Sequence, residues 1–382
     1  MVGDKRATLL LLVILCSLLV ALPNTEIVRA AEDSWVSKAP MQEARIGLGI
    51  AVVNDKIYAI GGVGPGGGTG GFCAFNEEYD PATDTWTFKA SMPTPRSLFG
   101  IAVYQDRIYC MGGYTLVGLV GVKTDVNEVY DPATDTWETK TSMPSARLGL
   151  EANIVKDKIY LIGGYESVNG TSVGVSNRTD VYDPATDTYT SKASIPTPVS
   201  YSASAVVDNK IYVMTSGLNQ IYDTESDSWS KGAPAPLPII LGSAGTTEDE
   251  FAPERIYVFG ANAAMPYYMF NVQNFPTQSY DPENNNWTVC TSMPTGRFST
   301  GVAVLNDSFY VIGGYTLEGG YTTERWTPST VPSAVNEQYT PVETIPEFPS
   351  WTPLLIMLVA VMVVAVIYRC TLLKPHHRGK AE

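Results

Sequence analysis

Ile57-Tyr58-Ala59-Ile60-Gly61-Gly62 is an apolar run that ends in two glycines, and it recurs along the chain at a spacing of about 50 residues. Four copies keep both glycines, and two degenerate copies precede the last one. The copies begin at Ile57, Ile108, Ile159, Ile211, Ile256 and Phe309. A unit that recurs at this spacing predicts that the chain folds as a series of similar structural repeats.

A second landmark follows each copy of the first. Tyr79-Asp80-Pro81 leads to Trp86, an aromatic residue seven positions after the tyrosine. The four equivalent pairs are Tyr130 with Trp137, Tyr182 with Tyr189, Tyr222 with Trp229 and Tyr280 with Trp287. The last copy, Tyr339-Thr340-Pro341, has no such aromatic residue, whereas Asp33-Ser34-Trp35 stands unmatched before the first unit. The two ends of the repeat region therefore complement each other.

Each unit has the pattern of four short strands. In the first unit, Gly49–Val53 is small and apolar, Asn54-Asp55 forms a tight turn, and the Gly-Gly strand follows. A longer loop leads to the Tyr79 strand, and the turn at 80–84 leads to an outermost strand. Four antiparallel strands per unit, repeated radially, predict an all-β fold, a six-bladed β-propeller. We expect residues 34–38 to close the ring as the outer strand of the blade built from residues 297–341.

The paired glycines, the tyrosine and the tryptophan at fixed offsets resemble the kelch repeat over roughly residues 34–342. The resemblance implies a kelch-type propeller. The copper oxidases among kelch propellers use histidine ligands, but the two histidines of this chain are His376 and His377, near its C-terminal end. The resemblance therefore implies the fold and not that activity.

The two ends of the chain have the pattern of export and anchoring segments. Residues 1–30 place Lys5 and Arg6 before an apolar run, which is typical of a signal peptide. The propeller is expected at 31–342 and a Pro-rich linker at 343–350. Residues 351–368 are apolar and uncharged, as a transmembrane helix requires, and the basic tail 369–382 follows. Basic residues stay on the cytoplasmic side, which predicts an extracellular propeller on a single-pass anchor unless the tail is processed.

The linker contains Pro346-Glu347-Phe348, which resembles the tripeptide before the terminal helix of some archaeal surface proteins. That resemblance implies cleavage by a sortase-like enzyme and transfer to a lipid. A proline-stiffened linker before a permanent anchor is the other interpretation, and the sequence leaves both open.

Composition argues against several functions. A formal net charge of −14 argues against nucleic acid as a partner. Because residues 31–342 contain no histidine, a Ser-His-Asp triad and imidazole metal sites are excluded there. We predict no catalytic residue, no metal and no cofactor. The sequence leaves open whether Cys73 and Cys110 form a disulfide, and it predicts that Cys290 is free.

Four arginines recur before the inner strands, and they have two interpretations. At the mouth of the channel, Arg45, Arg96, Arg147 and Arg297 would bind a carboxylate or sulfate. Alternatively they form ion pairs with the acid two residues before each landmark tyrosine. These acids are Glu77, Glu128, Asp180 and Glu337, and the two units without arginine have Gln220 and Gln278 instead. Because arginine and acid are present or absent together, the structural interpretation is favoured.

The loops after the Gly-Gly strands offer further candidates. Tyrosines suited to binding a glycan or protein stand at Tyr114, Tyr165, Tyr268 and Tyr315, and glycosylation sequons at Asn169, Asn177, Asn286 and Asn306. We expect a monomeric, non-catalytic surface recognition or adhesion module that binds a glycan or a protein. Two alternatives remain: an enzyme on acidic sugars, of mutarotase or lyase type, that uses arginine and carboxylates, and a structural surface-layer component.

Overall fold

The computed structural model describes residues 33–341 except 169, 249–251, 262–274, 276 and 323–324. The expected signal peptide, linker, apolar segment and basic tail lie outside the described residues, as do Asn169 and Tyr268. Across the described part of the chain, no helix has the length and apolar character needed to cross a bilayer.

Six four-stranded antiparallel sheets form from the repeats, and we number them in chain order. Sheet 1 contains β2 (Gly49–Val53), β3 (Lys56–Ile60), β4 (Asn76–Asp80) and β5 (Thr85–Lys89). Sheet 2 contains β6 (Gly100–Tyr104), β7 (Arg107–Met111), β10 (Asn127–Asp131) and β11 (Thr136–Lys140). Sheet 3 contains β13 (Glu151–Val155), β14 (Lys158–Ile162), β17 (Thr179–Asp183) and β18 (Thr188–Ser191).

The other three sheets follow the same order. Sheet 4 contains β19 (Ala203–Val207), β20 (Lys210–Thr215), β21 (Leu218–Asp223) and β22 (Ser228–Lys231). Sheet 5 contains β23 (Ile240–Thr246), β24 (Ile256–Ala261), β25 (Gln278–Asp281) and β26 (Asn286–Val289). Sheet 6 contains β28 (Gly301–Leu305), β29 (Ser308–Ile312), β32 (Asn336–Thr340) and, at its outer edge, β1 (Ser34–Lys38).

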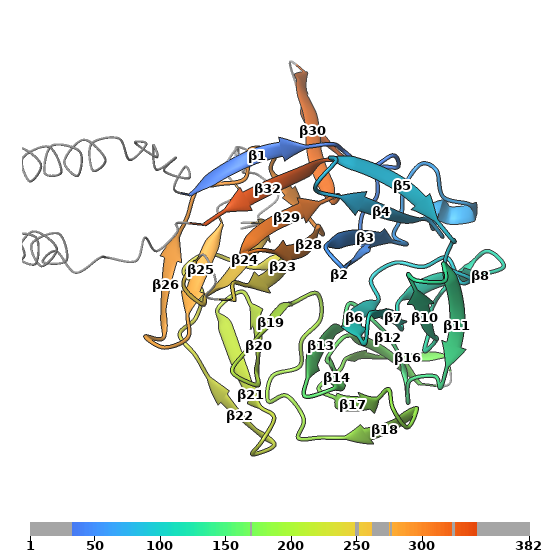
Figure 1. Ribbon diagram of the computed structural model, residues 1–382, viewed down its shortest axis with the longest axis vertical. Helices are drawn as coiled ribbons and strands as arrows, with labels where there is room; N and C mark the ends of the chain where they lie inside the picture. The colour runs from blue at the N-terminus through green and yellow to red at the C-terminus, as the bar shows by residue number, and fades with distance from the viewer. Residues whose placement is uncertain are drawn as a thin grey trace, which may run out of the picture. The chain divides into compact units, whose positions relative to one another are not determined.

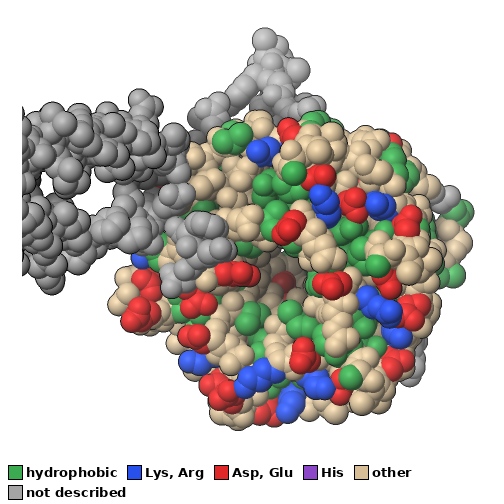
Figure 2. All heavy atoms as spheres, viewed as in Figure 1, with side chains coloured by type: hydrophobic (Ala, Val, Ile, Leu, Met, Phe, Trp, Pro, Cys, Tyr) green, Lys and Arg blue, Asp and Glu red, His purple; other side chains and the backbone are tan. Residues whose placement is uncertain are grey.

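The sheets stand side by side in a propeller-like ring (Figure 1). Their inner strands contact one another in the cyclic order β2, β6, β13, β19, β23, β28 and back to β2. Figure 2 shows that the ring is hollowed at its centre. The inner strands are rich in glycine and alanine because six backbones meet there. Gly301, for example, has no room for a Cβ, which would lie 2.0 Å from Ile50.

The core consists of six apolar clusters, one between each pair of neighbouring sheets. The landmark tyrosines are fully buried in these clusters. Tyr79 stacks on Trp86 at 4.9 Å between ring centroids, and its hydroxyl donates to Asp84 at 2.6 Å. The Trp86 indole nitrogen donates to the Ala39 carbonyl at 2.8 Å. Each outer strand is thereby fastened to the segment that enters its own sheet.

The N-terminal strand completes sheet 6. β1 pairs antiparallel with β32, and Trp35 lies opposite Tyr339. Asp33 accepts hydrogen bonds from the Tyr339 hydroxyl and from the backbone nitrogen of Thr291. Trp35 donates to the Thr291 carbonyl at 3.1 Å. These contacts repeat those of Asp84 and Trp86 in sheet 1. Residues 34–38 therefore close the ring as the outer strand of sheet 6, as the sequence predicts.

The loops after the Gly-Gly strands contain regular structure that the repeat pattern did not indicate. The elements in these loops are η1 (Thr69–Gly71), β8 (Tyr114–Val117), β9 (Val120–Lys123), β15 (Tyr165–Val168), β16 (Thr171–Val175), β30 (Tyr315–Thr322) and β31 (Arg325–Pro332). Two further short strands, β12 (Ala146–Leu148) and β27 (Arg297–Phe298), precede inner strands and pair with β15 and β30. Three of the loops are hairpins, β8–β9, β15–β16 and β30–β31. These hairpins extend one face of the ring, which we call the loop face.

The described cysteines are all free thiols. Cys73 and Cys110 are buried and form no disulfide, and Cys290 is unbridged as well. Burial raises the pKa of the Cys110 thiol to about 12, which keeps it protonated and unreactive at neutral pH.

Candidate functional site

One residue near the start of each inner strand adopts a left-handed backbone: five lie two positions before the strand, and Leu241 lies within β23. Together these residues form what we call the rim. The rim residues are Gly47, Leu98, Gly149, Tyr201, Leu241 and Ser299. Backbone hydrogen bonds connect them: Leu98 donates to Gly47 at 2.8 Å, and Gly149 donates to Leu98 at 2.8 Å. A positive φ is unfavourable for leucine and tyrosine, so the surrounding hydrogen bonds must hold it. The result is a rigid collar at one end of the channel.

Above the rim lies a cavity of about 800 Å³, which we call the mouth depression. Its lining is largely apolar and aromatic, and no described residue that lines it is charged. The large contributors are Phe72, Leu98, Tyr114, Tyr201, Leu241 and Tyr315. Phe72 packs on Tyr114 at 5.8 Å, and Tyr165 packs on Tyr201 at 6.1 Å between ring centroids. Aromatic groups held this way present rigid contact area to a ligand.

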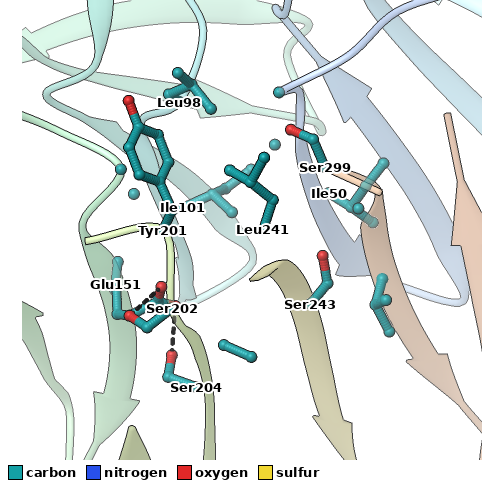
Figure 3. Close-up of a pocket in the computed structure, with 18 of the residues that line it drawn as sticks. Ile50, Leu98, Ile101, Glu151, Tyr201, Ser202, Ser204, Leu241, Ser243 and Ser299 are labelled. Carbon is teal, nitrogen blue, oxygen red and sulfur yellow. Dashed lines mark hydrogen bonds between the residues drawn. The ribbon is translucent and has the colours of Figure 1, made fainter. Parts of the chain in front are cut away.

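Below the rim, the channel between the inner strands holds a second cavity of about 270 Å³. Glu151, on β13, is the only charged side chain among the described residues that line it. Ser202 donates to one carboxyl oxygen at 2.9 Å and Ser204 to the other at 2.7 Å (Figure 3). The side chain is partly accessible from within the channel, but protein surrounds it. Desolvation raises its pKa from 4.5 to about 7, and the two serine hydrogen bonds oppose that shift.

The four repeat arginines lie beneath this surface rather than on it. All are fully buried, with 0% of their area exposed. Arg45 donates to Glu77, Arg147 to Asp180 and Arg297 to Glu337, each at 2.8 Å, and Arg96 pairs with Glu128. Burial lowers the pKa of Arg45, Arg147 and Arg297, while the partner acids oppose that shift. No guanidinium is accessible from the mouth depression, so a ligand-binding role for these residues is not supported.

In the two sheets without arginine, a glutamine occupies the position of the acid. The side chain of Gln220 accepts from the Thr197 nitrogen at 2.9 Å and donates to the Thr197 carbonyl at 3.1 Å. Gln278 does the same with Leu237, at 3.0 Å and 3.3 Å. An acid in that position needs a cation, whereas glutamine completes its hydrogen bonds with the backbone alone. This explains why arginine and acid are absent together.

Comparison with known proteins agrees with the repeat pattern. The Kelch motif family model matches residues 44–93, 95–144 and 146–196. The chain therefore contains kelch repeats. It is 29% identical over 278 residues to Kelch-like protein 15 of Danio rerio, and 30% identical over 292 residues to Kelch-like protein 36 of Bos taurus. These matches cover 72% and 76% of this chain but only 39% of each relative.

A solved structure of YjhT matches this kelch-repeat protein with a TM-score of 0.58. The match covers 76% of this chain and 99% of that one, at 18% sequence identity. A likeness at this level of identity concerns the fold alone.

Three of the four tyrosines predicted from the loops of this kelch-repeat protein lie among the described residues. Tyr114 and Tyr315 line the mouth depression. Tyr165 is exposed on β15 and supports Tyr201 from outside. The sequons at Asn177, Asn286 and Asn306 are exposed. The positions of Tyr114, Tyr165 and Tyr315 make the loop face the candidate contact surface.

Sequence reasoning missed Leu98, Tyr201, Leu241 and Glu151. A signal for them was present, because the rim residue always comes two positions after the repeat arginine or its replacement. Two positions further on, the other five repeats have Gly49, Gly100, Ala203, Ser243 and Gly301. A glutamate among small residues stands out once the repeats are aligned on the rim.

Proposed function

We propose that this kelch-repeat protein is a non-catalytic binding module whose loop face holds a protein partner. The observation that carries the proposal is an apolar patch on the hairpin β8–β9. Val117, Leu119 and Val120 are 66%, 86% and 64% exposed. Exposed apolar residues gathered on a loop tip are typical of interaction sites because their burial in a complex is favourable.

The patch is continuous with the mouth depression and with the next hairpin. Tyr114 belongs to β8 and lines the depression. Lys123 donates to Ser172 at 3.1 Å and so connects β9 to β16, where Val173 is also exposed. The exposed valines and leucine, together with a mouth depression whose described lining has no charged residue, favour a protein partner over a glycan, which needs many polar contacts. Kelch-repeat proteins in general act through protein–protein interaction, which supports the same choice.

The alternative of an enzyme on acidic sugars has less support. Such an enzyme needs an arginine near the reacting carboxylate, and the four repeat arginines are buried in ion pairs. The charged group in the channel is Glu151, which repels a carboxylate. A surface-layer role would require the loop face to contact copies of this chain, which the experiment below distinguishes.

We further propose that the ring is a monomeric six-bladed propeller displayed outside the cell. The basic and apolar pattern of residues 1–30, which is typical of a signal peptide, and the apolar stretch 351–368 followed by basic residues support this proposal.

The test uses the purified full chain and a phage library of random 12-residue peptides. Peptides selected on the wild type should bind at least about 10-fold more weakly to the Leu119→Ser, Val120→Ser double variant, a loss of about 1.4 kcal/mol. Val289→Ser is the matched control, because Val289 is 53% exposed on the outer strand β26. Equal loss in the control, or binding on a glycan array without any selected peptide, contradicts the proposal. Concentration-dependent self-association that Leu119→Ser abolishes would instead indicate the surface-layer role.

A further inference from the structure

Glu151 occupies a position that the other repeats reserve for small residues. Gly49, Gly100, Ala203, Ser243 and Gly301 fill the equivalent places at the start of the inner strands. A carboxyl group at this point projects into the channel (Figure 3). The other five residues at this level of the ring are uncharged. Glu151 therefore changes the charge inside the channel more than it changes the packing.

No cation balances this carboxyl group among the described residues around it. The neighbouring strand β19 provides Ser202, just before it, and Ser204, and the other neighbour β6 provides Gly100 and Ile101. Asn153 donates to Ser204 at 3.0 Å, which fixes the serine that contacts Glu151. Ser202 and Ser204 each use one hydrogen on a carboxyl oxygen, so both oxygens keep lone pairs for a ligand. A carboxylate without a counter-charge in a confined space is stabilised when a cation lies beside it.

The path to Glu151 passes through the rim. The mouth depression and the channel cavity share Gly47, Leu98, Tyr201, Leu241 and Ser299 in their linings. Figure 3 shows Leu98, Tyr201, Leu241 and Ser299 at one end of the pocket and Glu151 with its serines at the other. The two cavities therefore meet at the rim.

We propose that Glu151 binds the ammonium group of a lysine side chain, which the protein partner inserts from the mouth depression through the rim. The inference rests on the proposed function and names the chemistry of the partner. The four methylenes of lysine would pack against Leu98, Leu241 and the Tyr201 ring, and the three N–H donors would meet Glu151. An anionic or purely apolar ligand does not use this feature.

The test measures calorimetric binding of three probes to the full chain at pH 8.5. The probes are N-acetyl-glycyl-lysyl-glycinamide, its Nε-acetyl form, and butylammonium. The lysine peptide should bind the wild type, and Glu151→Gln should weaken it at least about 10-fold. Glu283→Gln, at an exposed turn between β25 and β26, is the matched control and should bind as the wild type does. Binding of the Nε-acetyl peptide equal to that of the lysine peptide overturns the proposal.

A second measurement covers the case in which Glu151→Gln alters the fold. With the wild type alone, affinity for the lysine peptide should fall about 10-fold or more between pH 8.5 and pH 5.5, because Glu151 protonates while lysine stays charged. A flat profile overturns the proposal. Binding of butylammonium without binding of the peptide overturns the lysine assignment and restricts the site to small amines.

The two proposals fail in different ways. If library peptides require Leu119 and Val120 but bind Glu151→Gln as well as the wild type, the binding face stands and the lysine site falls. If no peptide requires the hairpin, the proposed function falls, whatever butylammonium does.

Discussion

At the scale of single residues, one buried position is occupied in two ways: four repeats have an arginine–acid ion pair, and two have a glutamine bonded to the backbone. In sheet 2 Arg96 pairs with Glu128, and Glu128 also accepts from the Thr94 hydroxyl at 2.7 Å. In sheet 4 the equivalents are Val199 and Gln220, and the amide bonds to the backbone of Thr197. A buried pair adds little net stability, but a buried acid without its partner is strongly unfavourable.

We therefore expect Arg96→Val to destabilise the protein by about 3–5 kcal/mol, because Glu128 loses its counter-charge. Adding Glu128→Gln should recover most of this loss, since the amide can bond the Thr94 backbone as Gln220 bonds Thr197. Denaturant unfolding of the wild type, the single variant and the double variant measures both steps. A double variant less stable than Arg96→Val would contradict this explanation.

Glu151 makes a separate prediction about pH. Its folded pKa of about 7 lies above its ordinary value of 4.5, so the folded state holds the proton more tightly. The associated stability is fully present below pH 4.5 and is lost as the pH rises through 7. We expect Glu151→Gln to match the wild type near pH 4.5 and to be more stable by about 1–3 kcal/mol at pH 8.5, with allowance for the water in the channel. Thermal unfolding at the two pH values measures the difference. A constant difference would show that ionisation of Glu151 is not its cause.

The sequence identified the arginine–acid partners because six aligned copies reveal which residues change together. Glu151 escaped the same comparison, since it changes alone and has no partner to reveal it. The rim residues Leu98 and Tyr201 also escaped, because their left-handed backbone comes from hydrogen bonds to neighbouring sheets. Local sequence does not encode such long-range bonds.

At the scale of elements, the Gly-Gly pair connects each arginine to the next sheet. Gly61 and Gly62 have φ of 62° and 99°, which glycine tolerates. The Gly61 carbonyl accepts from Arg45 at 2.9 Å, and the Gly62 nitrogen donates to the Arg96 carbonyl at 2.9 Å. The two sheets without arginine have Thr215-Ser216 and Gly260-Ala261 at this position. The glycines and the arginine are therefore one structural unit, and each degenerate repeat lacks the arginine and at least one of the two glycines.

A comparison of Gly61 with Gly118 separates the effect of steric overlap from the effect of a left-handed backbone. Gly118→Ala, in the β8–β9 turn at φ 65°, has open space around the new methyl group and should cost about 1 kcal/mol. In Gly61→Ala, at φ 62°, the Cβ would lie 2.6 Å from the Arg96 carbonyl oxygen. We expect this variant to lose about 3 kcal/mol or more, because strain and overlap act together. Denaturant unfolding of the two variants decides. Equal losses would mean that the backbone conformation alone requires glycine.

The hairpins of the loop face are the elements that the sequence did not predict. The four strands of each repeat follow from alternating apolar residues and turn signals that recur along the chain. β8–β9 and β15–β16 have different sequences in each repeat and expose their valines, so no apolar periodicity marks a buried side. Their pairing depends on β12 and on the rim segments beside them.

At the scale of the whole molecule, stability depends on closing the ring. Each outer aromatic residue donates to the segment that enters its own sheet, as Trp137 does to the Ala90 carbonyl at 2.8 Å. In sheet 6 this role falls to Trp35 and Asp33 from the other end of the chain. The repeat pattern predicted this closure, because the last unit lacks an outer aromatic residue and Trp35 stands unmatched before the first unit. An open ring would lose these bonds and would leave β32 as an unpaired edge.

Removal of Asp33–Lys38 should therefore affect the entire ring and not only its ends. The deletion exposes the β32 edge, the Tyr339 hydroxyl and the sheet 5 to sheet 6 cluster that contains Trp35. We expect a loss of several kcal/mol, a thermal midpoint lower by on the order of 10 °C, and association through the free edge. Thermal unfolding and light scattering of the full-length deletion variant measure both effects. Leu119→Ser at the β8–β9 tip is the control and should leave the midpoint within about 2 °C, because the side chain is exposed. If the variant without Asp33–Lys38 remains a monomer and unfolds at the wild-type temperature, β1 does not hold the ring closed.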